Sequence, residues 1–176
     1  MSWIDASLAE GANGADFDRV LGLRPEFRED FTRFHDLLWK SVDPLLLELC
    51  RVRIAELLGC VSEMKRRTPA AVAAGLDERK LAALPGWPNH AGFRVPERAC
   101  LAFAEQFLLD PHGVTDEQVA DVIAHLGAPG LIAFVEALAI FEGFTRFRMI
   151  LEVDVPPLAY EDEEDEDDAD EAPEER

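Results

Sequence analysis

Three side chains that could do chemistry lie close together around position 60. Cys60, Glu63 and Arg67 are separated by three and four residues, so in a helix they would share one face. A cysteine becomes a nucleophile or a redox group once it is a thiolate, and a glutamate can transfer a proton. If this face lines a pocket, a thiol, a carboxylate and a guanidinium converge there.

The reactivity of Cys60 depends on the charges near its sulfur. At 1.5 Å per residue, Glu63 lies about 4.5 Å from Cys60 along a helix axis and Arg67 about 10.5 Å. The nearer anion opposes thiolate formation, whereas a helix start near Cys60 would favour it. Either Cys50 or Cys100 could resolve an oxidised Cys60, but only if the fold brings one of them close.

The segments that must position these side chains are predicted to be helices. Asp43 and Pro44 are typical of a helix start, and Gly59 of its end. A helix over about 60–74 should follow, stopping at Gly75 and kinked or split by Pro69. Apolar periodicity and capping residues predict further helices over 25–38, 77–84, 96–109, 115–126 and 129–151. No alternating strand pattern occurs, so the prediction is an all-α domain of six or seven helices.

Charge divides the chain into a body and a tail. The 176 residues carry a net charge of −19, and Glu161–Arg176 holds twelve acids and one base. We predict a loose segment at 1–15, one domain over 16–156, and a disordered acidic tail at 157–176 that is solubilising or engages a basic partner. The moderately acidic body gives no electrostatic reason to bind nucleic acid or an anionic membrane.

Other patterns bear on the compartment and on cofactors. The start, Met1–Asp5, lacks the basic and apolar regions of a secretory signal. The apolar stretch Leu131–Phe141 is shorter than the roughly 20 residues of a membrane span and is predicted to be a core helix. Three cysteines without framework spacing favour a cytoplasmic protein with reduced thiols. The four histidines lie in separate segments and no phosphate-binding loop occurs, so we predict no metal and no cofactor.

The segment Glu48–Cys60 resembles the signature helix of the carboxymuconolactone decarboxylase superfamily, which includes the AhpD-like alkylhydroperoxidases. The resemblance continues through Ala70–Glu78, Ala83–Trp87, Phe93–Phe107 and Phe144–Phe147, and covers roughly residues 25–152. It implies a single AhpD-like helical domain that forms a homo-oligomer, with pockets near the subunit contacts.

The chain departs from the family at the redox motif. AhpD-like enzymes carry Cys-x-x-Cys-x-x-x-His, and the resemblance matches Cys60 to the first cysteine, Glu63 to the second and Arg67 to the histidine. Glu48 matches the upstream glutamate of the family's proton relay, and Glu142 replaces an asparagine near the end of the domain. The decarboxylase branch tends to have Glu and His where this chain has Glu63 and Arg67.

Three functions remain open on these residues. The first is a peroxidase-related oxidoreductase reduced to the single cysteine Cys60. The second is a decarboxylase-like acid–base lyase in which Glu48 and Glu63 transfer protons, burial or repulsion raises one carboxyl pKa, and Arg67 holds the carboxylate of a small-molecule substrate. The third is a non-catalytic protein that binds a ligand or partner. In that reading Cys60 is a small buried residue, and Glu63 with Arg67 is an ordinary surface ion pair. Glu48 is then a solvated or salt-bridged helix residue, since Arg51 and Arg53 are nearby.

Overall fold

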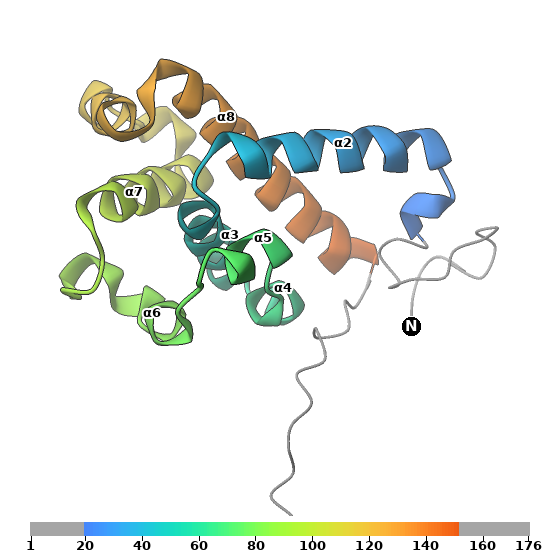
Figure 1. Cartoon of the computed structure of the whole chain (residues 1–176), viewed down its shortest axis with the longest axis horizontal. Helices are drawn as coiled ribbons and strands as arrows, with labels where there is room; N and C mark the ends of the chain where they lie inside the picture. Colours follow the sequence, from blue (N-terminus) through green and yellow to red (C-terminus); the bar gives the residue numbers. More distant parts are fainter. Residues whose placement is uncertain (1–19, 152–176) are drawn as a thin grey trace, which may run out of the picture.

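A computed structural model describes residues 20–151, which are helical with no strand among them (Figure 1). The all-α prediction is therefore confirmed for this range. The predicted loose segment 1–15 and acidic tail 157–176 lie outside the described residues. The helices are α2 (Pro25–Ser41), α3 (Pro44–Leu58), α4 (Val61–Lys65), α5 (Pro69–Ala73), α6 (Glu78–Ala82), α7 (Val95–Leu109) and α8 (Asp116–Leu151), with 3-10 turns at Leu84–Asn89 and Pro111–Gly113.

Helix α3 is the centre of the core. It packs against α7, α8 and α4, and most of its residues are buried, including the charged Glu48 and Arg51. Asp43 begins the helix as predicted, because its carboxylate accepts a hydrogen bond from the backbone N–H of Leu45 at 2.9 Å. A buried helix at this position carries its charged side chains into the interior of the domain.

A tight corner joins α3 to α4. Gly59 adopts φ 73°, which a residue without a Cβ reaches at little cost. The N–H of Gly59 donates to the carbonyl of Glu56, and that of Cys60 donates to the carbonyl of Ala55, so α3 ends in a Schellman motif. Cys60 is thereby fixed at the start of α4, where it is 4 % exposed.

The predicted helix over 60–74 is two short helices in the structure. Helix α4 ends at Lys65, the chain is extended at Arg66 and Thr68, and α5 begins at Pro69. The break comes four residues before Pro69, so the proline is only part of its cause. Glu63 and Arg67 consequently lie on different segments, and the prediction that they share one helix face with Cys60 is wrong.

Helix α8 begins where the sequence predicts, and it is interrupted at Gly127, between the two separate helices predicted over 115–126 and 129–151. The N–H of Gln118 donates to Oγ1 of Thr115 at 3.2 Å, and the N–H of Thr115 donates to Oε1 of Gln118 at 3.0 Å, which is a capping box. Gly127, at φ 71° and ψ 169°, separates the 115–126 part from the part that ends at Leu151.

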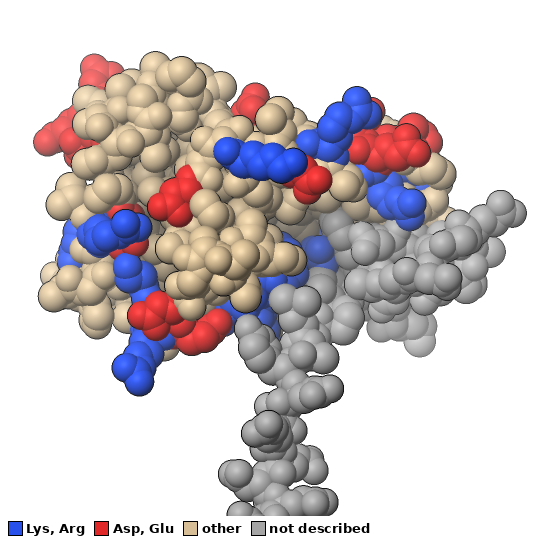
Figure 2. All heavy atoms as spheres, in the orientation of Figure 1, with Lys and Arg blue, Asp and Glu red and all other residues tan. Residues whose placement is uncertain are grey.

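By length and composition alone α8 could cross a membrane, since its most apolar stretch has a mean hydropathy of 1.8. The apolar stretch of α8 is thus longer than Leu131–Phe141. In the structure α8 packs on α2, α3 and α7. Charged side chains of both signs are interspersed over the described face of the molecule in Figure 2, with broad uncharged areas between them.

Candidate functional site

Arg51 is the centre of a buried ionic network. Its guanidinium is 1 % exposed, and each of its five N–H groups has an acceptor. Nε and Nη2 donate to the two carboxylate oxygens of Glu48 at 3.0 and 2.7 Å. Nη1 donates to the carboxylate and to the backbone carbonyl of Glu63, both at 2.8 Å, and Nη2 also donates to the carbonyl of Arg66 at 2.6 Å. The donors of the Arg51 guanidinium are thus fully used within the protein.

Glu48 is held by the segment that follows α4 as well as by Arg51. The backbone N–H of Thr68 donates to Oε1 of Glu48 at 3.2 Å, and the Thr68 hydroxyl donates to Oε2. Burial acts to raise the pKa of Glu48, but the charge and hydrogen bonds of Arg51, with those of Thr68, outweigh it and leave the pKa below its ordinary value. Glu48 is therefore an ionised carboxylate at neutral pH.

Glu63 is surrounded by three arginines. Besides Arg51, its carboxylate pairs with Arg66 at 3.0 Å and with Arg148 of α8 at 2.8 Å. Burial again acts to raise the pKa of Glu63, and the charges of Arg66, Arg51 and Arg148 outweigh it, so the pKa is lowered. Burial lowers the pKa of Arg148 to about 10, so this guanidinium also remains charged at neutral pH.

The two glutamates predicted to lie close together do so, but around a cation and not around an open site. Both contact Arg51, and both have a lowered pKa. The prediction that burial or repulsion raises the pKa of one of them is wrong, because the arginines compensate for the lost hydration. Neither the pocket between α2 and α8 nor the smaller one between α3, α6 and α7 is lined by Glu48 or Glu63.

Cys60 lies at the edge of this network. Its Sγ is 3.5 Å from Oγ of Ser62, and the thiol lies near the guanidinium of Arg148. The other two cysteines are fully buried free thiols. Burial raises the pKa of Cys50 well above its ordinary value and that of Cys100 to about 12. Neither thiol is therefore disposed to ionise and attack an oxidised Cys60.

Arg67 points away from Glu63. Its Nε and Nη2 donate to the carboxylate of Glu78 at 2.7 and 2.9 Å, and its Nη1 donates to the carbonyls of Met64 and Arg66. Both the predicted convergence of Arg67 with Glu63 and the alternative ion pair between them are therefore wrong. Arg66, one residue earlier, takes the place next to Glu63.

His35 of α2 is a neighbour of the network that sequence reasoning missed. Its Nε2 accepts a hydrogen bond from Nε1 of Trp39 at 2.9 Å. Burial, and next the positive charge of Arg66, hold the pKa of His35 below its ordinary value. The spacing of His35 and Trp39, one helical turn apart, was the available signal for their pairing. Arg51 had a local signal too, because it stands three residues after Glu48, whereas Arg148 pairs with Glu63, which is distant in sequence.

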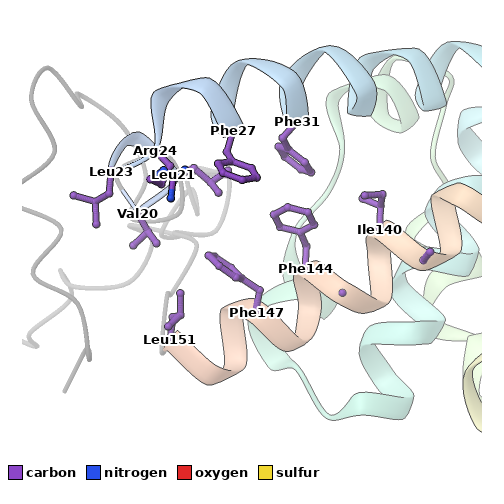
Figure 3. Close-up of a pocket in the computed structure, with 12 residues that line it drawn as sticks. Val20, Leu21, Leu23, Arg24, Phe27, Phe31, Ile140, Phe144, Phe147 and Leu151 are labelled. Carbon is purple, nitrogen blue, oxygen red and sulfur yellow. The ribbon is translucent and has the colours of Figure 1, made fainter.

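An apolar pocket lies between α2 and α8. It encloses about 480 Å³ between α2, residues 20–24 and the second half of α8. Figure 3 shows Phe27 and Phe31 of α2 facing Phe144 and Phe147 of α8, with Arg24 at one end. The rings of Phe31 and Phe144 are 4.1 Å apart between centroids. Among residues 20–151, no group of three or more His, Cys, Asp and Glu side chains is placed to hold a metal ion.

This arrangement of helices is that of AhpD-like proteins. One structure with the same fold is a protein of unknown function from Agrobacterium tumefaciens, described as a putative antioxidant defence protein AhpD; the TM-score is 0.68 at 16 % identity, over 78 % of this chain and 95 % of that one. A second is the debrominase Bmp8, in a cysteine-to-alanine variant bound to 2,3,4-tribromopyrrole; the TM-score is 0.67 at 16 % identity, over 81 % of this chain and 77 % of that one.

Part of the sequence matches a known protein family. Residues 25–106 match the sequence model of the carboxymuconolactone decarboxylase family, whereas no protein of curated function matches the chain. The match over residues 25–106 and the shared fold support a relationship of this chain to the carboxymuconolactone decarboxylase/AhpD-like superfamily. The matched range contains the whole α3–α5 region, and therefore the Glu48, Arg51 and Glu63 network.

Proposed function

We propose that the protein is a non-catalytic, ligand-binding member of its superfamily, in which the region of the redox motif has become a structural ionic network. The observation that carries this proposal is the coordination of Arg51. Its five N–H groups are bound to Glu48, Glu63 and backbone carbonyls in an environment with almost no solvent exposure. Because the Arg51 guanidinium has no donor left for a substrate, it stabilises the fold and does not bind a reactant.

The pKa values also support this proposal over an acid–base lyase. A general acid must hold its proton near the working pH, so an effective glutamate has a raised pKa. The arginines lower the pKa of both Glu48 and Glu63, which leaves neither as a proton donor at neutral pH. Arg67, assigned by spacing to hold the substrate carboxylate, is bound to Glu78 instead.

A single-cysteine oxidoreductase is the second candidate, and one observation favours it. Cys60 lies near the guanidinium of Arg148, and reactive cysteines are commonly found beside cationic side chains. Its reaction with a hydroperoxide would transfer one oxygen to sulfur, giving a sulfenic acid and an alcohol. Turnover would then require an external thiol, because Cys50 and Cys100 are buried with raised pKa values.

Hydroperoxide consumption separates the two candidates. The full-length protein is incubated with cumene hydroperoxide and dithiothreitol, and the rate is compared between wild type, Cys60→Ser and a control, Cys100→Ala, that loses a buried thiol elsewhere. The proposal predicts equal rates for all three, at the level of dithiothreitol alone. A wild-type rate that is lost in Cys60→Ser and kept in Cys100→Ala would establish the oxidoreductase instead.

A further inference from the structure

Helix α2 is anchored in the core near its C-terminal end. Leu38 and Trp39 are its two buried residues. The Trp39 ring packs against the Phe141 ring of α8, with 5.7 Å between centroids, and its indole N–H donates to Nε2 of His35 at 2.9 Å. The half-buried His35 therefore helps to orient a side chain that anchors α2.

The bond to Trp39 requires a neutral imidazole at position 35. An indole nitrogen can only donate, so Nε2 of His35 carries no hydrogen, and the neutral ring has its hydrogen on Nδ1. A protonated imidazole has hydrogens on both nitrogens and accepts no hydrogen bond. Protonation of His35 therefore breaks the contact and leaves the indole N–H of the buried Trp39 facing another donor, which is unfavourable.

The charges next to His35 also oppose its protonation. The charged groups around the imidazole are contributed by several elements: Asp36 of α2, Arg51 of α3, Glu63 of α4 and Arg66 of the segment after α4, with Arg148 of α8 bound to Glu63. Burial, and next the charge of Arg66, lower the pKa of His35, and this outweighs the two carboxylates. The pKa of Arg66 is itself lowered by burial and then by the charge of Arg51. Positive charge is thus already concentrated on this side of His35, and a further cation there is repelled.

We propose that His35 is a proton-operated switch that controls how tightly α2 is attached to the body of the domain. The neutral imidazole accepts the Trp39 hydrogen bond, and α2 packs on α3 and α8. Uptake of a proton removes that bond and places a cation next to Arg66, so α2 loosens from the ionic network. This inference goes beyond the proposed function, because it holds whether or not Cys60 reacts.

The direction of the pH dependence follows from the folded state. Because the pKa of His35 is below its ordinary value of 6.5, the unfolded or loosened chain binds the proton more readily than the packed one. The attachment of α2 is therefore complete above pH 6.5 and is weakened as the pH falls below that value towards the folded pKa.

Three variants separate the titration of His35 from the contact that it makes. His35→Gln keeps an acceptor for Trp39 in its side-chain carbonyl but cannot be protonated. His35→Leu has no acceptor at any pH. His125→Gln is the matched control, because it removes an exposed histidine of α8.

Amide hydrogen exchange of the full-length protein, followed by NMR between about pH 8 and 5, tests the proposal. We expect the protection factors of the α2 amides to fall about tenfold on acidification in wild type and in His125→Gln. They should stay constant in His35→Gln and should be low already at pH 8 in His35→Leu. The indole N–H resonance of Trp39, assigned by its absence from Trp39→Phe, should shift in wild type with a midpoint below pH 6.5, and this readout needs no variant at position 35.

Three results would overturn the proposal. An equal fall of α2 protection in wild type and His35→Gln would mean that another group titrates. A Trp39 indole resonance that does not move over this range would mean that its hydrogen bond survives. Equal protection of the α2 and α7 amides at every pH would mean that α2 leaves only when the whole domain unfolds.

Discussion

Replacing Arg51 by methionine should destabilise the protein more than any other single change to its charged residues. The substitution keeps an unbranched side chain of similar length but removes all five donors. Glu63 retains Arg66 and Arg148, whereas Glu48, which is 0 % exposed, retains among the described residues only the two donors of Thr68. Breaking a buried pair in this way costs about 3–5 kcal/mol, because a buried charge is left uncompensated.

We therefore expect Arg51→Met to lower the free energy of unfolding by about 4 kcal/mol, measured by urea unfolding followed by far-UV circular dichroism. Since a domain of this size has only about 5–15 kcal/mol in total, Arg51→Lys serves as a milder variant. It keeps the charge but has three donors and no planar fork, and should cost about 2 kcal/mol.

Two further variants make the reasoning refutable. In Glu48→Gln/Arg51→Met the uncompensated charge at position 48 is gone, so the double variant should lose less stability than the sum of the two single variants. Arg146→Met is the matched control, because Arg146 is 53 % exposed and pairs with Glu142 at 3.0 Å; it should cost less than about 1 kcal/mol. An Arg51→Met effect as small as that of Arg146→Met would refute a structural role for the network.

Three other predictions concern pH, the Thr68 contact and the tail. The pKa values of Glu48 and Glu63 are lower in the folded state than their ordinary value of 4.5. Their contribution to stability is therefore present above that pH and is lost as the pH falls through the folded values. In urea unfolding between pH 7 and 3, the free energy of unfolding should fall less steeply with pH for Glu48→Gln than for wild type. Thr68→Val should cost about 1–3 kcal/mol by thermal or urea unfolding, because a buried carboxylate oxygen loses its donor, and a cost near zero would argue against that contact. Deleting residues 161–176 should leave the unfolding midpoint unchanged while altering solubility, and a truncated chain that fails to fold would contradict the division into body and tail.

The ends of the main helices could be predicted because their causes are local. Asp43 before Pro44 caps α3 through its own side chain, Gly59 adopts the left-handed conformation at its end, and Thr115 with Gln118 forms the capping box of α8. These contacts join residues at most three positions apart, so the amino-acid order contains the whole interaction. The resemblance to the superfamily is supported by the sequence model over residues 25–106, which ends before α8.

A split of the 60–74 helix at Pro69 was predicted, but the end of α4 four residues earlier was not, because part of its cause lies on another helix. Arg51 of α3 donates a hydrogen bond to the backbone carbonyl of Arg66, and the carboxylate of Glu48 accepts one from the backbone N–H of Thr68. These two backbone groups are therefore paired with side chains of α3 and not with other backbone groups of a helix. A local signal was available only for Thr68, since a residue that precedes proline is driven towards extended conformations. Arg67 was misplaced because the break comes before it and not at Pro69.

The roles of Glu48 and Glu63 were misjudged for a related reason. Spacing and resemblance brought the two carboxylates together, and the nearby Arg51 left a salt-bridged Glu48 open, but nothing in the sequence indicated that one arginine binds both carboxylates. Whether a buried carboxyl is a proton donor or a structural anion depends on its partners in space. Here those partners are Arg51, Arg66 and Arg148, and the last of them is 85 positions beyond Glu63.

The central claim is that Glu48 and Glu63 are anions bound by arginines and not proton donors. A carboxyl ¹³C NMR titration of the full-length protein tests it most directly, with the two resonances assigned by their absence from Glu48→Gln and Glu63→Gln. We predict that both carboxyl groups titrate below the ordinary glutamate value of 4.5. A resonance from either residue that titrates above about pH 6, where a glutamate can act as a general acid, would contradict the claim and restore the acid–base lyase.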